Sequence, residues 1–193
     1  MNVEKTKIAV LLTEGFADWE HALLCGTGKL FYGLDIEFYS PTPGILLSQG
    51  GQSVNISHGT DELLTSNSKA LVIVGGLIWE TTNAPDISSV VNAFYESGAI
   101  VAGICGGTLA LARAKLLNEC KHTSNDSSFL AKNVPDYSGQ NQYSESVIAV
   151  SDNRVITAAG TAPVSFTAAI FEAIGLDRNT VDEFRGMLAA EHQ

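Results

Sequence analysis

The sequence predicts an α/β fold, a three-layer sandwich in which helices cover both faces of a mostly parallel central sheet. Three observations predict it. Short, continuous apolar runs recur along the chain, as is typical of strands that are buried on both faces. Helix-like patterns follow most of these runs, and this alternation favours parallel pairing of the strands. Glycine-containing turns close several of the runs.

The first half of the chain supplies three of the expected strands. They are short runs that contain β-branched residues, at 7–12, 35–39 and 70–74. A helix is expected over residues 17–31, where an imperfect apolar stripe outweighs Gly26 and Gly28, which each cost about 1 kcal/mol relative to Ala. The polar stretch 48–57 predicts a hairpin that turns at its pair of glycines.

The second half continues the alternation and then becomes more mixed. The expected elements, in order, are a helix at 87–97, a strand at 99–104, a helix at 108–117, a hairpin that pairs 147–150 with 155–159, and helices at 164–174 and 180–191. The hairpin is expected to turn at residues 151–153. The chain contains no internal repeat, low-complexity tract or linker, so we expect a single domain over residues 1–193.

The composition excludes several classes of protein. With 193 residues, of which 45% are hydrophobic and 17% charged, the chain has an ordinary globular composition. Its 21 acidic and 11 basic residues give a formal net charge of -10. Because so acidic a surface repels phosphate backbones and anionic lipids, we expect neither a nucleic-acid partner nor a membrane partner.

Cysteine usage and the first residues indicate the compartment. Three cysteines are too few, and odd in number, for a secreted disulfide scaffold. The polar start of the chain runs directly into a strand, without the apolar core of a signal peptide. No stretch reaches the roughly 18 apolar residues that a membrane span needs. We therefore expect a cytoplasmic protein.

The candidate catalytic residues follow the expected strands. In such folds, ligands gather beyond the carboxyl ends of the strands. Three sequence features lie there, namely the turn at 14–20, the pair Gly75-Gly76, and the motif Gly-Ile-Cys-Gly-Gly at 103–107. The motif has the strand–turn–helix layout of a nucleophile elbow, with Cys105 as the nucleophile. The alternative interpretation is a buried cysteine at a glycine-rich strand end.

Cys105 needs a proton partner in order to react. At an ordinary pKa of about 8.5, only about 3% of a thiol is ionised at neutral pH, and a helix N-terminus lowers that pKa by at most about 1.5. Glu20 is a candidate, because it lies one turn into the first expected helix, which starts at the same sheet edge. A carboxylate repels a thiolate by about 4 kcal/mol at 4 Å and an effective dielectric of 20, so we expect the pair to share one proton, with Glu20 neutral. Alternatively, Glu20 is solvated or pairs with His21.

Taken together, these motifs resemble the ThiJ/PfpI superfamily, which includes PfpI-type peptidases, isonitrile hydratases and stress proteins and has a flavodoxin-like fold shared with class I glutamine amidotransferases. The resemblance covers about residues 5–175. Its motifs are Gly15 with Glu20, residues 74–76, 103–107, 109–112, 116–117, and 160–163 leading into Phe166. It implies Cys105 as the nucleophile, Glu20 as its protonated partner, the N–H groups of Gly76 and Gly106 as the oxyanion-binding pair, and a homodimer.

The chain departs from the family pattern near its nucleophile. Many peptidase-like members carry His directly after the cysteine, where this chain has Gly106. The family's third polar residue follows the next strand, which places Asn125 there, with His122 three residues earlier. Either side chain could orient a substrate, while His122 could equally be a structural histidine. Glutamine hydrolysis requires a later His-x-Glu pair and is not expected, because residues 123–191 contain no histidine.

No metal ion and no cofactor are expected. Cys120 and His122 would share one face of a short strand, but two ligands do not make a zinc site. The acidic residues lack the spacing of a calcium loop. Cys25 is expected in the core. Trp79 has three interpretations, which are a pocket wall, a contact with a dimer partner, and a cap on the core.

Three functions remain open. The first is a cysteine enzyme for a small carbonyl or acyl compound, with hydrolase, glyoxalase-like or hydratase-like chemistry. The second is a redox-sensing stress-response protein without turnover, in which Glu20 hydrogen-bonds the oxidised sulfur of Cys105. The third is a binding protein that has lost catalysis. In each case the partner is a small molecule.

Overall fold

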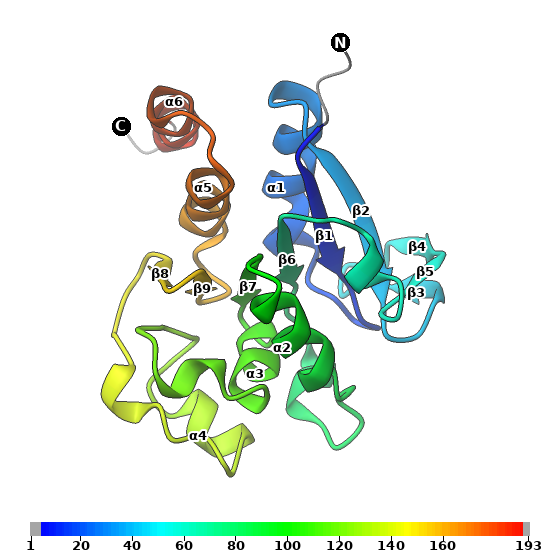
Figure 1. Ribbon diagram of the computed structural model, residues 1–193, viewed down its shortest axis with the longest axis vertical. Helices are drawn as coiled ribbons and strands as arrows, with labels where there is room; N and C mark the ends of the chain where they lie inside the picture. The colour runs from blue at the N-terminus through cyan, green and yellow to red at the C-terminus, as the bar shows by residue number, and fades with distance from the viewer. Residues whose placement is uncertain (1–4, 191–193) are drawn as a thin grey trace.

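The computed structural model describes residues 5–190 and contains a seven-stranded sheet with helices on both of its faces (Figure 1). The strand order is β5-β2-β1-β6-β7-β9-β8, and every pairing except that of β8 with β9 is parallel. The strands are β1 (Lys7–Leu11), β2 (Asp35–Ser40), β5 (His58–Gly59), β6 (Ala70–Ile73), β7 (Ile100–Ile104), β8 (Val150–Asp152) and β9 (Val155–Ala158). The predicted α/β class is confirmed.

A separate two-stranded hairpin lies beside the carboxyl end of the sheet. Its strands are β3 (Gly44–Leu47) and β4 (Ser53–Ile56), which pair antiparallel. The expected hairpin is thus present and turns at the expected glycines, although its first strand lies upstream of the expected residues. Backbone bonds between Gly15 and Leu47 (2.8 Å) and between Gln49 and Phe16 (2.9 Å) fix the hairpin against the loop that follows β1.

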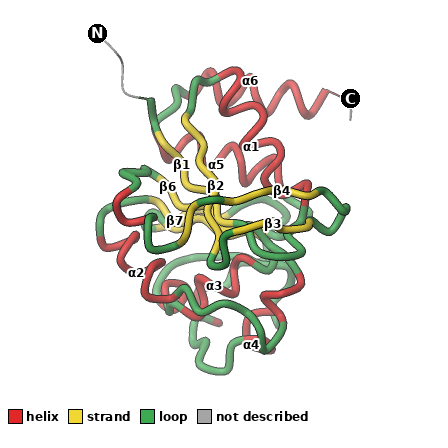
Figure 2. Tube along the Cα trace, turned by 90° about the vertical axis from the view of Figure 1, so that its right-hand side faces the viewer, coloured by secondary structure: helices red, strands yellow, loops and turns green. Residues whose placement is uncertain are grey.

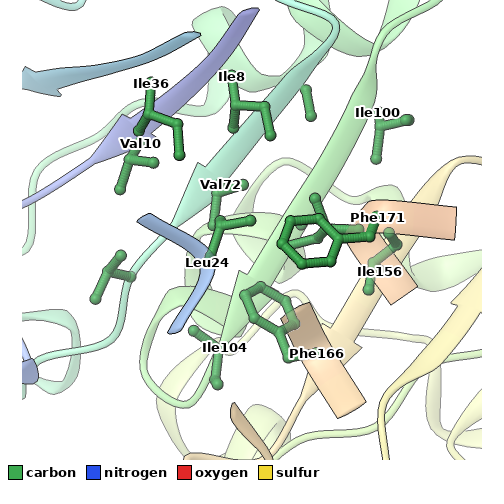
Figure 3. Close-up of a cluster of buried hydrophobic side chains, with 14 of the residues drawn as sticks. Ile8, Val10, Leu24, Ile36, Val72, Ile100, Ile104, Ile156, Phe166 and Phe171 are labelled. Carbon is green, nitrogen blue, oxygen red and sulfur yellow. The ribbon is translucent and has the colours of Figure 1, made fainter. Parts of the chain in front are cut away.

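The helices form a layer on each side of the sheet (Figure 2). One layer contains α1 (Asp18–Phe31), α5 (Pro163–Ile174) and α6 (Arg178–Ala189), and the other contains α2 (Ser88–Glu96), α3 (Gly107–Arg113) and α4 (Phe129–Asn133). Alternate strand residues enter opposite cores, because successive side chains of a strand point to opposite faces. In β1, for example, Ile8 packs in the first core (Figure 3) and Ala9 in the second.

Element boundaries differ from the prediction in a few places. The helix expected over 108–117 ends at Arg113, because Lys115 adopts a left-handed conformation (φ 64°) before a short 3-10 turn. The last helix begins at Arg178, two residues before the prediction, and Glu191 lies outside the described residues. The short strand expected at Cys120 is reduced to one bridge between His122 and Tyr143. Among the described helices, none has both the length and the apolar composition that a membrane span needs.

Candidate active site

Cys105 occupies the sharp junction between β7 and α3. Its φ of 54° lies in the left-handed region, which a residue with a side chain adopts at a cost. A Cβ on Gly103 would lie 2.9 Å from the carbonyl oxygen of Gly107, and one on Gly107 would collide with the carbonyl of Ile73. The glycines of the motif therefore allow the main chain to turn tightly, as the nucleophile-elbow interpretation requires.

Glu20 lies in the first turn of α1 and is 1% exposed. Its Oε2 accepts a hydrogen bond from the amide of Gly75 at 2.7 Å. Its Oε1 and the Cys105 sulfur both approach Gly160, since a Cβ built there would lie 3.1 Å from Oε1 and 3.0 Å from Sγ. Glu20 is therefore neither solvated nor paired with His21, and the alternatives considered from the sequence are wrong.

Burial and mutual proximity shift the pKa values of the Glu20 carboxyl and the Cys105 thiol. Burial raises the pKa of Glu20 to about 7, and hydrogen bonds from Cys105 and from the Gly75 amide oppose this rise. Burial, together with the nearby Glu20 carboxylate, raises the pKa of Cys105 to about 11, while hydrogen bonds from Asn125 and the Gly106 amide oppose it. Between these two pKa values the pair holds one proton, as expected, but the thiol has the higher pKa, so the proton lies on the sulfur and not on Glu20.

The side chain of Asn125 lies next to the Cys105 sulfur, and two hydrogen bonds fix the orientation of its amide group. Its Nδ2 donates to the Cys105 Sγ at 3.3 Å, and its Oδ1 accepts from the Gly160 amide at 3.0 Å. Because Gly160 donates to the oxygen, the NH₂ group must face the sulfur. Asn125 is therefore a hydrogen-bond donor that cannot accept the thiol proton.

The side chain of His122 does not reach Cys105, because two hydrogen bonds hold it against Cys120 and Tyr137. It is buried, with Nδ1 at 2.8 Å from the carbonyl oxygen of Cys120 and Nε2 at 2.6 Å from the hydroxyl of Tyr137. Since Nδ1 must donate to the carbonyl, Nε2 accepts from Tyr137, and burial lowers the pKa of the ring. Of the two candidates after the expected strand, Asn125 reaches Cys105 and His122 does not.

The two expected oxyanion donors lie next to each other. A Cβ on Gly106 would lie 3.3 Å from the amide nitrogen of Gly76 and 2.8 Å from its carbonyl oxygen. The loops after β6 and β7 therefore present their amides at the same edge of the sheet, as expected for strands that pair in parallel.

Three residues lie in segments that the sequence pointed to, but their individual roles in the site were not expected. A Cβ on Gly75 would lie 2.5 Å from Glu20 Oε2 and 2.7 Å from Cys105 Cβ, so only glycine fits there. Gly160 touches the sulfur in the same way, and its carbonyl accepts from Trp19 Nε1 at 2.9 Å. The only signal for these residues was their place at strand ends, which does not reveal which loops meet.

Cys120 and Trp79 belong to the core, and the half-buried Cys25 packs against it. Burial raises the pKa of Cys25 to about 12, and the Cys120 sulfur donates to the carbonyl of Leu116 at 3.1 Å. Trp79 is 0% exposed, with its indole N–H bonded to the Val74 carbonyl at 3.0 Å. It therefore caps the core and is neither a pocket wall nor an exposed contact. Residues 5–190 contain no group of three or more metal-ligating side chains.

Comparisons with known proteins agree with this geometry. A profile of the DJ-1/PfpI family matches residues 6–173. The chain is 33% identical over 171 residues to the uncharacterized protease YdeA of Bacillus subtilis, with 89% of this chain and 84% of that protein covered. It is 29% identical over 180 residues to the uncharacterized protease YoaZ of the same organism, with 89% and 85% covered.

A solved structure is also similar over nearly its whole length. The DJ-1 superfamily protein Atu0886 from Agrobacterium tumefaciens is 38% identical, with a TM-score of 0.92 over 97% of this chain and 100% of that one. The resemblance inferred from the sequence motifs is therefore confirmed.

Proposed function

The chain belongs to the DJ-1/PfpI family, and from this premise we propose that it is a cysteine-nucleophile enzyme that acts on a small carbonyl or acyl compound. One observation carries the proposal. The Cys105 sulfur meets a buried acid, Glu20, and an amide donor, Asn125, at a strained strand-to-helix turn. Unlike a structural cysteine, this sulfur has both a proton carrier and a hydrogen-bond donor.

The chemical step follows from these groups. The sulfur of Cys105 forms a bond to the carbonyl carbon, and the electron pair of the C=O π bond moves to the oxygen. The amides of Gly76 and Gly106 donate to this oxyanion. Glu20 carries the proton from the thiol to the oxygen, which leaves a neutral tetrahedral adduct. Hydrolase and glyoxalase-like reactions both begin with this adduct, and a hydratase-like reaction would begin with attack of the same sulfur on another electrophilic carbon.

Peptide hydrolysis fits the site less well, although both curated relatives are called uncharacterized proteases. Expulsion of an amine requires a group that can protonate nitrogen. The Asn125 carboxamide is too weak an acid to protonate an amine, and His122 is hydrogen-bonded to the Cys120 carbonyl and the Tyr137 hydroxyl. Glu20 would have to supply every proton, so we expect aldehydes and activated esters to react faster than peptides.

The test compares the three cysteines of the chain. We expect Cys105→Ala to abolish turnover of methylglyoxal and of a chromogenic ester, because it removes the nucleophile. Cys25→Ala and Cys120→Ala serve as matched controls and are expected to keep activity, since both sulfurs lie in or against the core. Full activity of Cys105→Ala would remove this residue from the mechanism.

A redox-sensing function is the second candidate. The donors that face the sulfur, Asn125 Nδ2 and the Gly106 amide, could equally hydrogen-bond the oxygens of a cysteine sulfinate. Mild peroxide treatment followed by mass analysis tests this function. Two added oxygen atoms confined to Cys105, in a protein without turnover, would support it, and oxidation spread over all three cysteines would contradict it.

We further propose that the protein acts as a cytoplasmic homodimer on a small molecule, without a cofactor. This proposal depends on the family resemblance and on the acidic composition. Light scattering coupled to size-exclusion chromatography measures the mass in solution, and a monomeric mass would contradict the dimer.

A further inference from the structure

Three consecutive side chains at the start of α1 hold three separate loops around Cys105. Each side chain bonds the main chain of a glycine, in the β3–β4 turn, in the loop after β9 and in the loop after β6, respectively. The pairs are Asp18 with Gly50 (2.8 Å), Trp19 with Gly160 (2.9 Å) and Glu20 with Gly75 (2.7 Å). The first turn of α1 therefore fixes the Gly75 and Gly160 loops, which border the sulfur, and ties the β3–β4 turn to them.

Trp19 differs from its two neighbours because much of its side chain faces solvent. The residue is 49% exposed, although its indole N–H is bonded to the Gly160 carbonyl. The exposed part of the ring therefore offers only carbon atoms and the π face. Because Gly160 touches the Cys105 sulfur, the indole is fixed at the rim of the reaction space.

The two glycines that border the Glu20 carboxyl and the Cys105 sulfur offer no side chain that could recognise a substituent. Gly75 and Gly160 wall these two groups with main chain, at positions where a Cβ would approach Glu20 and Cys105 within about 3 Å. Because Glu20 and Cys105 already fill the space in front of both glycines, a carbonyl group that reaches the sulfur must carry its substituent away from them. Trp19 is the large apolar side chain that is bonded to this wall.

The charges near the rim disfavour anionic substituents. Asp18 precedes Trp19, and Asp126 follows Asn125; hydrogen bonds, from Ser48 and Ser128 respectively, hold the pKa of both carboxyls below its ordinary value. Within residues 5–190, no Lys or Arg side chain bonds to the site residues Cys105, Glu20, Trp19 and Asn125. An anionic substituent would therefore find no compensating cation bonded to these residues.

We propose that Trp19 determines substrate specificity by stacking on an uncharged, flat apolar or aromatic substituent of the carbonyl compound. This inference rests on the proposed function, because it assigns the substrate class of the same site. An indole is the side chain best suited to such stacking, and a ring that is already held by a hydrogen bond loses little freedom when a substrate binds.

The kinetic test uses two aldehydes that differ only in their substituent, phenylglyoxal and methylglyoxal. We expect Trp19→Ala to lower kcat/KM for phenylglyoxal about tenfold more than for methylglyoxal, chiefly through KM. Trp19→Phe keeps a ring and should recover most of the difference. Phe31→Ala removes an exposed aromatic residue at the other end of α1 and is the matched control. Equal losses for both aldehydes in Trp19→Ala would overturn the proposal.

A binding measurement separates this subsite from turnover. In Cys105→Ala, acrylamide should quench the fluorescence of the exposed Trp19 but not that of the buried Trp79. We expect phenylacetamide to protect Trp19 from quenching, while acetamide at the same concentration does not. Absence of protection, or a Trp19 that is inaccessible in the free protein, would overturn the proposal. Protection in a protein that turns over neither aldehyde would support the subsite and contradict the enzymatic function.

Discussion

Glu20 makes the stability of the protein depend on pH. Its pKa rises from 4.5 in the unfolded chain to about 7 in the folded protein, because burial disfavours the carboxylate. The folded state therefore binds this proton more tightly, and its contribution is complete below pH 4.5 and is lost as the pH rises through 7. The loss amounts to about 3 kcal/mol.

The measurement compares wild type with Glu20→Gln by urea unfolding at pH 5 and pH 8. We expect the free energy of unfolding of wild type to fall, relative to that of the variant, between these pH values. The comparison cancels the other acids, whose pKa values are lowered and which act in the opposite direction. A constant difference between the two proteins would contradict a raised pKa.

Asn125 tunes the reactivity of the sulfur through its orientation. In Asn125→Asp, the Gly160 amide would bond one carboxylate oxygen and leave the other facing Cys105. The added charge should raise the pKa of the thiol and slow alkylation by iodoacetamide at pH 8 about tenfold. Asn125→Ala removes only the donor and should slow it less. An Asp variant that reacts at the wild-type rate would contradict this role.

Individual site residues differ in how far the sequence could predict them. Cys105 lies between glycines within one local motif, so a single segment of the sequence was enough to identify it. Glu20 required a contact between two segments, which the parallel sheet makes plausible and the family resemblance suggested. Gly75, Gly160 and Trp19 act through contacts with main chain far along the sequence, and no local pattern encodes them.

At the scale of elements, the start of α6 depends on its capping residue. Asp177 is the N-cap and accepts a hydrogen bond from the amide of Thr180 at 3.0 Å. We expect Asp177→Ala to lower the free energy of unfolding by about 1 kcal/mol, and Asp177→Asn to lower it much less, because Asn also caps helices well. Urea unfolding at pH 7 measures both, and equal losses would contradict a capping role.

Helices and strands were predicted correctly where the hydrophobic pattern determines them. Their ends and turns were predicted less well where an unusual backbone conformation determines them. The turn between β8 and β9 was expected at residues 151–153 but consists of Asn153 and Arg154, which both have positive φ. Such a pair makes the two-residue turn that suits a hairpin, and Arg is not one of the residues that signal it. Likewise, Lys115 gives no sign in the sequence that α3 ends before it.

At the scale of the whole molecule, two cores share one sheet. Because β1, β6 and β7 contribute side chains to both, neither core can lose its packing without exposing the other. The predicted three-layer architecture is confirmed, and the single domain over residues 1–193 stays a prediction. It implies one cooperative unfolding transition.

Two probes test this cooperativity. Trp19→Phe leaves Trp79 as the only tryptophan, and Trp79 lies in the core that faces α2 and α3. We expect its fluorescence and the far-ultraviolet circular dichroism, which reports all helices, to change at the same urea concentration. Separate midpoints would indicate that the two layers unfold independently.

The glycine wall around the sulfur limits how the protein could be redesigned. Random mutagenesis at Gly75 or Gly160 adds a Cβ where Glu20 and Cys105 already stand, so such libraries should yield inactive clones. Improved catalysts for new compounds should instead arise from changes in the surrounding loops. Divergent relatives would then keep the same residues around the sulfur and differ in the surrounding loops, which select the compounds that reach it.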